Sequence, residues 1–132
     1  MKTKADAVKG WLRKADSDLA NVRACLTANE AFDTACFHAQ QAAEKCLKAY
    51  MLACDIDITF IHNLEKLIEL CAERDRSFLE LKEIGQTLTP YAVSLRYDED
   101  FWPDRSTVEE ALSGAETISK FVVDRLPGDM KP

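Results

Sequence analysis

Hydrophobic positions recur every three or four residues along most of the chain, which is the spacing of amphipathic helices. The pattern predicts a first helix from about Ala5 to Ala28, ended by Asn29 and Glu30. A second helix is expected from about Asp33 to Cys54, with Asp33 or a neighbour as its N-cap. Two long antiparallel helices joined by a short turn would result.

The middle of the chain predicts shorter elements. Residues 55–59 alternate like a strand, but no partner run exists elsewhere, so they are expected to form a loop. A third helix should span Asn63 to about Arg74, and a fourth should begin near Ser77. Pro90 should kink or end the fourth helix because proline interrupts the hydrogen-bond ladder.

The last helix follows a loop at residues 96–105. Two capping boxes are equally available to open it, Ser106 with Glu109 or Thr107 with Glu110. The helix should run to Leu126 and be followed by a tail at residues 127–132. The sequence therefore predicts an all-α protein, an up-and-down bundle of four to five helices, as a single domain over residues 1–132.

The most informative stretch is residues 37–51 of the second helix. Small residues on one side should permit close approach of neighbouring helices; they are Ala39, Ala42, Ala43 and Ala49. A polar stripe occupies the other side and consists of Gln41, Glu44, Lys45 and Lys48. Glu44 and Lys48 are four residues apart, which allows an ion pair along the helix.

Composition narrows the class of protein. A hydrophobic content of 47% with only 4 Gly and 4 Pro favours a folded protein with long helices. The net charge of −6 opposes non-specific binding of nucleic acid, so RNA is not an expected partner. No apolar run is long enough to span a membrane, and the start of the chain lacks the apolar stretch of a secretory signal. A cytoplasmic location without membrane association is expected.

Cysteine and histidine spacing gives no sign of a metal or cofactor. The five cysteines show no Cys-x-x-Cys spacing and are expected to be reduced, buried residues. His38 and His62 lie far apart in the sequence without clustered acids, so no metal is predicted. Asp98, Glu99 and Asp100 lack the spacing of a calcium loop. No cofactor is expected either, because no glycine-rich phosphate loop is present.

The polar stripe of the second helix has two interpretations. It is either a solvated face with salt bridges or a ligand site, in which Lys45 or Lys48 approaches a phosphate and Gln41 positions the ligand. In the second case Arg96 would clamp a phosphate or carboxylate, although it could equally form a structural ion pair with Glu44.

The histidines and the aromatic residues of the 96–105 loop also allow alternatives. His62 is a candidate base, but it stands at a helix entrance where it would serve in capping or packing. His38 fits a hydrogen-bonded core or interface residue better than a catalytic one. Phe101 and Trp102 either tuck back onto the bundle or anchor a partner.

Several segments together resemble a known family. They are Trp11 with Lys14-Ala15 and Asp18-Leu19, residues 36–50 with their Gln-Gln-Ala-Ala-Glu-Lys core, His62-Asn63-Leu64, and Leu95-Arg96-Tyr97. In this order they resemble the HEPN domain over essentially the whole chain. The resemblance implies a helical bundle, often a homodimer, frequently encoded beside a small nucleotidyltransferase in a toxin–antitoxin pair.

Toxic members of the family are metal-independent ribonucleases with an Arg followed by His after a spacer of four to six residues. This chain lacks that signature, because the three allowed positions after Arg96 hold Phe101, Trp102 and Pro103. Neither histidine has an arginine at the required distance upstream.

Three functions therefore remain open. The first is a non-catalytic, dimeric binding module that partners a nucleotidyltransferase, with a nucleotide or another anion as candidate ligand near Lys45, His62 and Arg96. The second is a ribonuclease with an atypical site built from Arg96 with His62 or Tyr97. The third is a purely structural interaction protein.

Overall fold

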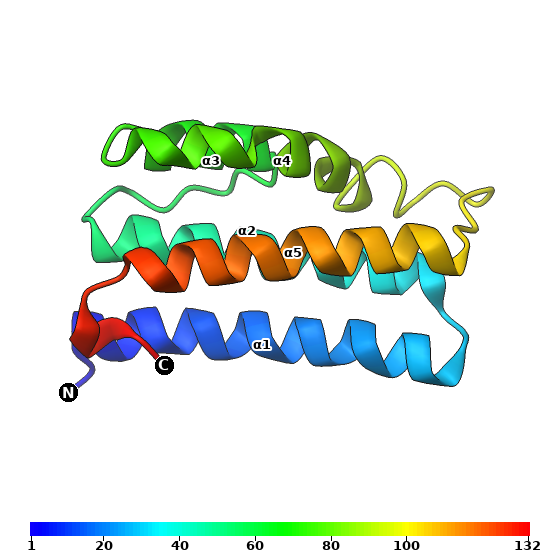
Figure 1. The fold of residues 1–132 in the computed structure, drawn as a ribbon, viewed down its shortest axis with the longest axis horizontal. Coiled ribbons are helices and arrows are strands. Elements are labelled where there is room, and N and C mark those ends of the chain that lie inside the picture. Colours follow the sequence, from blue (N-terminus) through cyan, green and yellow to red (C-terminus); the bar gives the residue numbers. More distant parts are fainter.

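The computed structural model describes all 132 residues, and it is entirely helical, with no β-strand. Three long helices form its body: α1 (Lys4–Ala28), α2 (Phe32–Ala53) and α5 (Arg105–Arg125). Figure 1 shows that α2 and α5 run in one direction and α1 in the other. Two short helices, α3 (Leu64–Ala72) and α4 (Lys82–Leu88), form a further layer on one side. The predicted all-α helical bundle is confirmed.

The central helix of the bundle is α2, which packs against α1, α5 and α3. The small residues predicted to face its neighbours, including Ala39, Ala42 and Ala43, are 0% exposed. Short side chains at these positions let the neighbouring helices approach closely, and Leu47 and Met51 fill the remaining space. The packing face expected from the sequence is therefore buried.

The first two helices begin in different ways. Thr3 caps α1 in a reciprocal box with Asp6, and Asn29 ends this helix in the left-handed conformation. For α2 the prediction named Asp33 or a neighbour as the N-cap, and the N-cap is Ala31, two residues earlier, with φ 57° and no side-chain cap. The turn from α1 is so short that α2 starts directly after the left-handed Ala31, which places Asp33 inside the first helical turn.

The fourth and fifth helices also start differently from the prediction. Residues Arg76–Leu81 form a 3₁₀ turn capped by Asp75, and α-helical geometry begins at Lys82. Pro90 lies in a second 3₁₀ turn, Thr89–Tyr91, which ends α4 as expected. Neither predicted capping box opens α5, because the side chain of Asp104 accepts the hydrogen bond from the Thr107 backbone.

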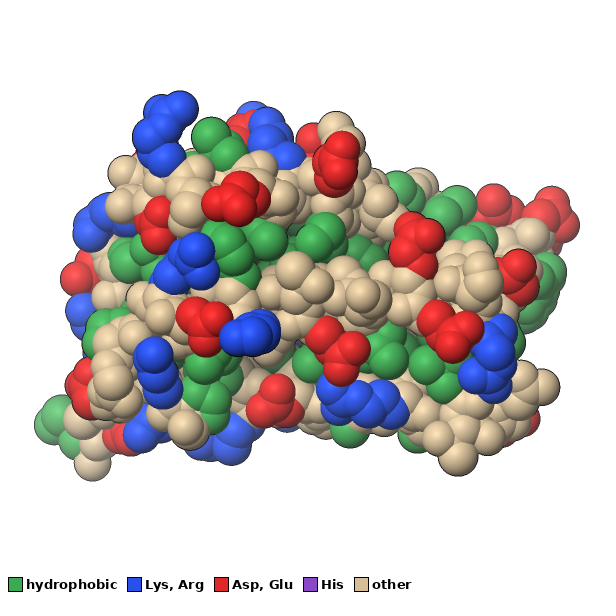
Figure 2. Space-filling model, in the orientation of Figure 1, with side chains coloured by type: hydrophobic (Ala, Val, Ile, Leu, Met, Phe, Trp, Pro, Cys, Tyr) green, Lys and Arg blue, Asp and Glu red, His purple; other side chains and the backbone are tan.

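Figure 2 shows one broad face of the molecule, with hydrophobic side chains along the seam between the α3–α4 layer and α5. At this seam Gly114 permits close contact, since a Cβ there would lie 2.9 Å from Cγ2 of Ile84. Acidic and basic side chains are interspersed over the rest of this face, so it carries no patch of one sign.

The connecting segments complete the fold. Residues 55–63 contain no strand, as predicted, and lead from α2 to α3. The segment after Pro127 was expected to be a plain tail, but Gly128–Met130 form a 3₁₀ turn that contacts α1. None of the helices is both long enough and apolar enough to cross a membrane.

Candidate functional site

Polar side chains are buried in only one region of the molecule, around α2 and the part of α1 beside it. The buried polar residues are Asp18, Gln40, Glu44 and Lys48. With their partners they form two groups. The Glu44 cluster consists of Gln40, Glu44, Lys48 and His62, and the Asp18 cluster consists of Asp18, His38 and Lys45.

Every polar partner in the Glu44 cluster points at the carboxylate of Glu44. Lys48 Nζ lies 2.9 Å from Oε2, His62 Nδ1 lies 3.1 Å from Oε1, and Gln40 Nε2 donates to Oε1 at 3.2 Å. Gln40 also donates to the His62 carbonyl at 3.0 Å, which fixes the segment before α3 against α2. The predicted pair between Glu44 and Lys48 is therefore confirmed, but both side chains are only 7% exposed, so the face is not a solvated one.

The environment of Glu44 keeps this carboxyl ionised. Burial alone raises the pKa of Glu44, but hydrogen bonds from Lys48, His62 and Gln40 outweigh burial and hold the pKa below its usual value. A buried charge of this kind is stable because each lone pair faces a donor or a cation. The cluster thus places an ionised carboxylate, paired with Lys48, beneath the exposed ring of His62.

The Asp18 cluster joins α1 to α2. Asp18 Oδ1 lies 2.8 Å from His38 Nδ1, and Asp18 Oδ2 accepts from Lys45 Nζ at 2.6 Å. Because the Asp18 carboxylate can only accept a hydrogen bond, the facing Nδ1 of His38 carries the proton. Nε2 of His38 is then left for another partner. The His38 side chain is 30% exposed, so the expected hydrogen-bonded histidine also reaches the surface.

Arg96 reaches α2 by a different contact from those expected. Its guanidinium lies 3.9 Å from the centre of the Phe37 ring and 5.5 Å from that of Tyr97. The alternative of an ion pair between Arg96 and Glu44 is wrong, because the partners of Glu44 are Lys48 and His62. Phe37 also contacts the His38 ring edge-on, with ring centres 5.4 Å apart.

The predicted site residues therefore divide. Gln41 joins the Glu44 cluster by donating to Gln40 Oε1 at 2.7 Å. Lys45 lies instead with Asp18, while the guanidinium of Arg96 lies over the Phe37 ring of α2 and over the ring of its neighbour Tyr97. His62 does not cap α3, since the side chain of Asn63 does so.

Two residues at the centres of these clusters, Asp18 and Gln40, were not predicted as site residues from the sequence. Asp18 stands on the hydrophobic stripe of α1 between Ala15 and Val22, and Gln40 stands among the buried alanines of α2. In both cases the available signal was a polar residue at a position where helical spacing places an apolar one.

Phe101 and Trp102, in the loop before α5, were expected either to tuck back onto the bundle or to anchor a partner, and the two residues differ. Phe101 stacks on Tyr91 with ring centres 5.7 Å apart and thus tucks back onto the bundle. Trp102 remains 76% exposed. No three or more His, Cys, Asp and Glu side chains lie close enough together to hold a metal ion.

Comparison with known proteins identifies the family. A model of the HEPN domain matches residues 8–126, which include both clusters and Arg96. The chain belongs to the HEPN domain family. HEPN domains commonly form dimers.

Two solved structures share this HEPN fold. The crystal structure of TT1696 from Thermus thermophilus is 29% identical, with a TM-score of 0.75, and the match covers 90% of this chain and 98% of that one. ST0689, described as an archaeal HEPN homologue, is 20% identical with a TM-score of 0.73, covering 91% of this chain and 98% of its own. Among curated proteins, none matches the chain.

Proposed function

We propose that the chain is a HEPN binding module that works as a homodimer and partners a nucleotidyltransferase in a toxin–antitoxin-type pair. The observation that carries this proposal is the surface around the two clusters, where large apolar side chains are exposed beside a rigid polar network. Phe60 is 99% exposed two residues before His62, and Tyr97 is 77% exposed beside Arg96. Exposed aromatic residues next to fixed polar groups are typical of protein interfaces.

A nucleotide or another anion fits this surface at Arg96 rather than at the lysines. Lys45 and Lys48 are neutralised by Asp18 and Glu44, so neither offers a free charge to a phosphate. Arg96 forms no ion pair, and its ring contacts leave the guanidinium N–H groups available for bidentate hydrogen bonds.

The mass of the protein in solution tests the dimer. Light scattering coupled to size-exclusion chromatography should give twice the 14.9 kDa of one chain. Changing Phe60 and Tyr97 together to Ser should reduce this mass to that of a monomer, whereas Trp102→Ser should leave it unchanged. A monomeric wild type, or an unaffected double variant, would contradict an interface on this surface.

The same variants test the partner. The purified nucleotidyltransferase encoded beside this chain should bind the wild type and Trp102→Ser alike and bind the double variant more weakly. Retention of full binding by the double variant would show that the partner binds to another surface. If the nucleotidyltransferase did not bind the wild type, the alternative of a purely structural interaction protein would be favoured. A melting temperature that no nucleotide raises would favour the same alternative.

A ribonuclease remains the second candidate because of one contact. Phe37 touches both Arg96 and His38, and Asp18 orients the His38 ring, which brings together a candidate base and a candidate phosphate clamp. RNA cleavage by the purified protein that is lost in Arg96→Ala would establish this activity. Parallel His38→Ala and His62→Ala variants would identify the base, and no cleavage by the wild type would exclude the candidate.

A further inference from the structure

A groove of about 220 Å³ lies between α4 and α5, at the seam visible in Figure 2. It has an apolar floor and acidic edges, and its lining residues are Glu83, Ile84, Thr87, Leu88, Glu110 and Gly114. We propose that this groove receives an arginine side chain from a basic segment of a partner protein, with the guanidinium held by the two glutamates.

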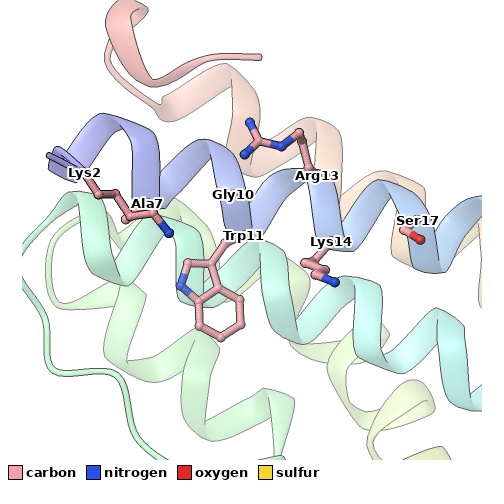
Figure 3. Close-up of a pocket in the computed structure, with 7 residues that line it drawn as sticks. All are labelled: Lys2, Ala7, Gly10, Trp11, Arg13, Lys14 and Ser17. Carbon is pink, nitrogen blue, oxygen red and sulfur yellow. The ribbon is translucent and has the colours of Figure 1, made fainter.

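The walls of this groove come from two helices that are packed together. A larger hollow of about 630 Å³ lies beside the first half of α1, but all of its lining residues fall within residues 2–17. Figure 3 shows that Arg13 and Trp11 point to opposite sides of α1, so that hollow is the open face of one helix. In the α4–α5 groove the packing of Gly114 on Ile84 fixes the separation of the two walls before any partner arrives.

The two glutamates at the edges are unpaired. Neither Glu83 nor Glu110 forms an ion pair within the chain, and no lysine or arginine lines the groove. The adjacent Lys82 is already engaged, with its Nζ 3.1 Å from a carboxylate oxygen of Glu69. Because Glu83 stands on α4 and Glu110 on α5, a cation in the groove is attracted from both walls.

The floor between the glutamates is apolar. Leu88 is 1% exposed, and Ile84 is half-buried and packs against the hydrophobic core. Gly114 adds no side chain, and a Cβ there would lie 2.9 Å from Ile84 and 3.9 Å from Leu88. The floor therefore suits a long aliphatic stem, and the edges suit a positive charge at the end of that stem.

Size and charge together favour an arginine side chain as the occupant. Pockets for small-molecule ligands commonly span about 300 to 1,000 Å³, which is more than this groove offers. Arginine is favoured over lysine because its planar guanidinium presents several N–H donors, enough to bond two carboxylates at once. Arginine is also among the residues that contribute most to binding at protein interfaces.

The surroundings of the groove define the rest of the partner segment. Glu109 directly precedes Glu110, Glu80 lies three residues before Glu83, and both are exposed. Hydrophobic side chains continue along the seam beyond the groove (Figure 2). A segment that carries an arginine between apolar side chains, without acids, is therefore complementary to this face in charge and polarity.

Nuclear magnetic resonance with short peptides tests the groove directly. Acetyl-Leu-Arg-Leu-amide should shift the Gly114 amide signal of the isotope-labelled protein saturably, with a Kd below about 10 mM. The amides of Gly10 and Gly128, which lie outside the groove, should not shift. The same peptide with citrulline in place of arginine, similar in shape but uncharged, should bind at least about fivefold more weakly. Equal binding of the two peptides, or equal shifts throughout the acidic residues 98–104, would overturn the proposal.

Charge-matched variants locate the contact. Glu83→Gln with Glu110→Gln should weaken binding of the arginine peptide at least about fivefold, since both charge-assisted contacts are lost. Glu30→Gln with Glu73→Gln removes the same charge from exposed positions elsewhere and should leave binding unchanged. Equal loss in both double variants would refute a specific site, because it would show attraction to the net charge alone.

Two further measurements separate this groove from other assignments. Spermidine, a flexible polyamine, should bind more weakly than the arginine peptide, and tighter binding of spermidine would assign the groove to a free cation instead. Glu83→Gln with Glu110→Gln should leave the mass in solution equal to that of the wild type, because neither Phe60 nor Tyr97 lines the groove. A lower mass of this double variant would place the groove within an interface between copies of the chain and overturn its assignment to a different partner.

Discussion

Among single residues, Glu44 holds the polar centre of the molecule together through its contacts with Lys48, His62 and Gln40. We expect Glu44→Gln to lower the free energy of unfolding at pH 7 by about 2 to 4 kcal/mol, because it leaves the buried Lys48 without its counter-charge. Urea unfolding measures the change. The exposed pair of Glu69 with Lys82 provides a control, and Glu69→Gln should cost less than about 1 kcal/mol.

The same carboxyl predicts a pH dependence. Because the pKa of Glu44 is lower in the folded protein than its ordinary value of 4.5, its stabilisation is present above about pH 4.5 and is lost as the pH falls through the folded pKa. Wild-type stability should therefore decline more steeply than that of Glu44→Gln below this pH. Identical acid limbs in the two proteins would mean that folding does not lower the pKa of Glu44.

The cysteines differ in reactivity according to burial. Cys36, Cys46 and Cys71 are buried, while Cys25 and Cys54 are half-exposed. Burial raises the pKa of Cys36, Cys46 and Cys71 to about 12, which leaves little thiolate at pH 8. Iodoacetamide at pH 8 should therefore label two thiols rapidly in the native protein and all five in urea, as mass spectrometry would detect. Rapid native labelling of a third thiol would contradict this packing.

On the scale of the helices, the close approach of α2 to its neighbours depends on the alanines. Ala43 is 0% exposed, and Ala43→Leu should cost about 1 to 3 kcal/mol because the larger side chain overpacks the interface. A denaturant midpoint equal to that of the wild type would show that the interface can expand. Ala24→Leu is a suitable control, since Ala24 is exposed on α1.

Substitutions at the start of α5 distinguish the observed N-cap from the predicted ones. Asp104 accepts from the Thr107 backbone at 2.9 Å, so Asp104→Ala should lower the Tm by about 2 to 5 °C. Ser106→Ala and Thr107→Ala, which remove the caps expected from the sequence, should have smaller effects. A larger effect of Ser106→Ala than of Asp104→Ala would mean that Ser106 caps α5, as the first predicted capping box requires.

For the whole molecule, the central place of α2 predicts one cooperative unfolding transition. It packs against α1, α5 and α3, so no part of the bundle keeps a core once α2 leaves. Tryptophan fluorescence, from Trp11 on α1 and Trp102 before α5, should give the same midpoint as circular dichroism at 222 nm. An earlier transition by circular dichroism would indicate that α3 and α4 unfold separately and would argue against a single domain.

The bundle was predictable because helical periodicity is a local property. The stripe of α1 and the alanines of α2 appear in the sequence as they appear in the core. Element boundaries were less predictable at turns, where Ala31 and Asp104 became caps in place of Asp33 and Ser106. Several nearby residues can cap a helix, and the path of the preceding chain selects among them.

The sequence by itself determined the helices, their buried faces and the pair of Glu44 with Lys48, because each depends on residues a few positions apart in one helix. Only the tertiary structure decided that His62 joins Glu44, that Lys45 turns to Asp18 and that Arg96 rests on Phe37. Each of these contacts joins segments separated by 18 or more residues, and its partners are chosen by how the helices pack. Local spacing carries no information about that choice.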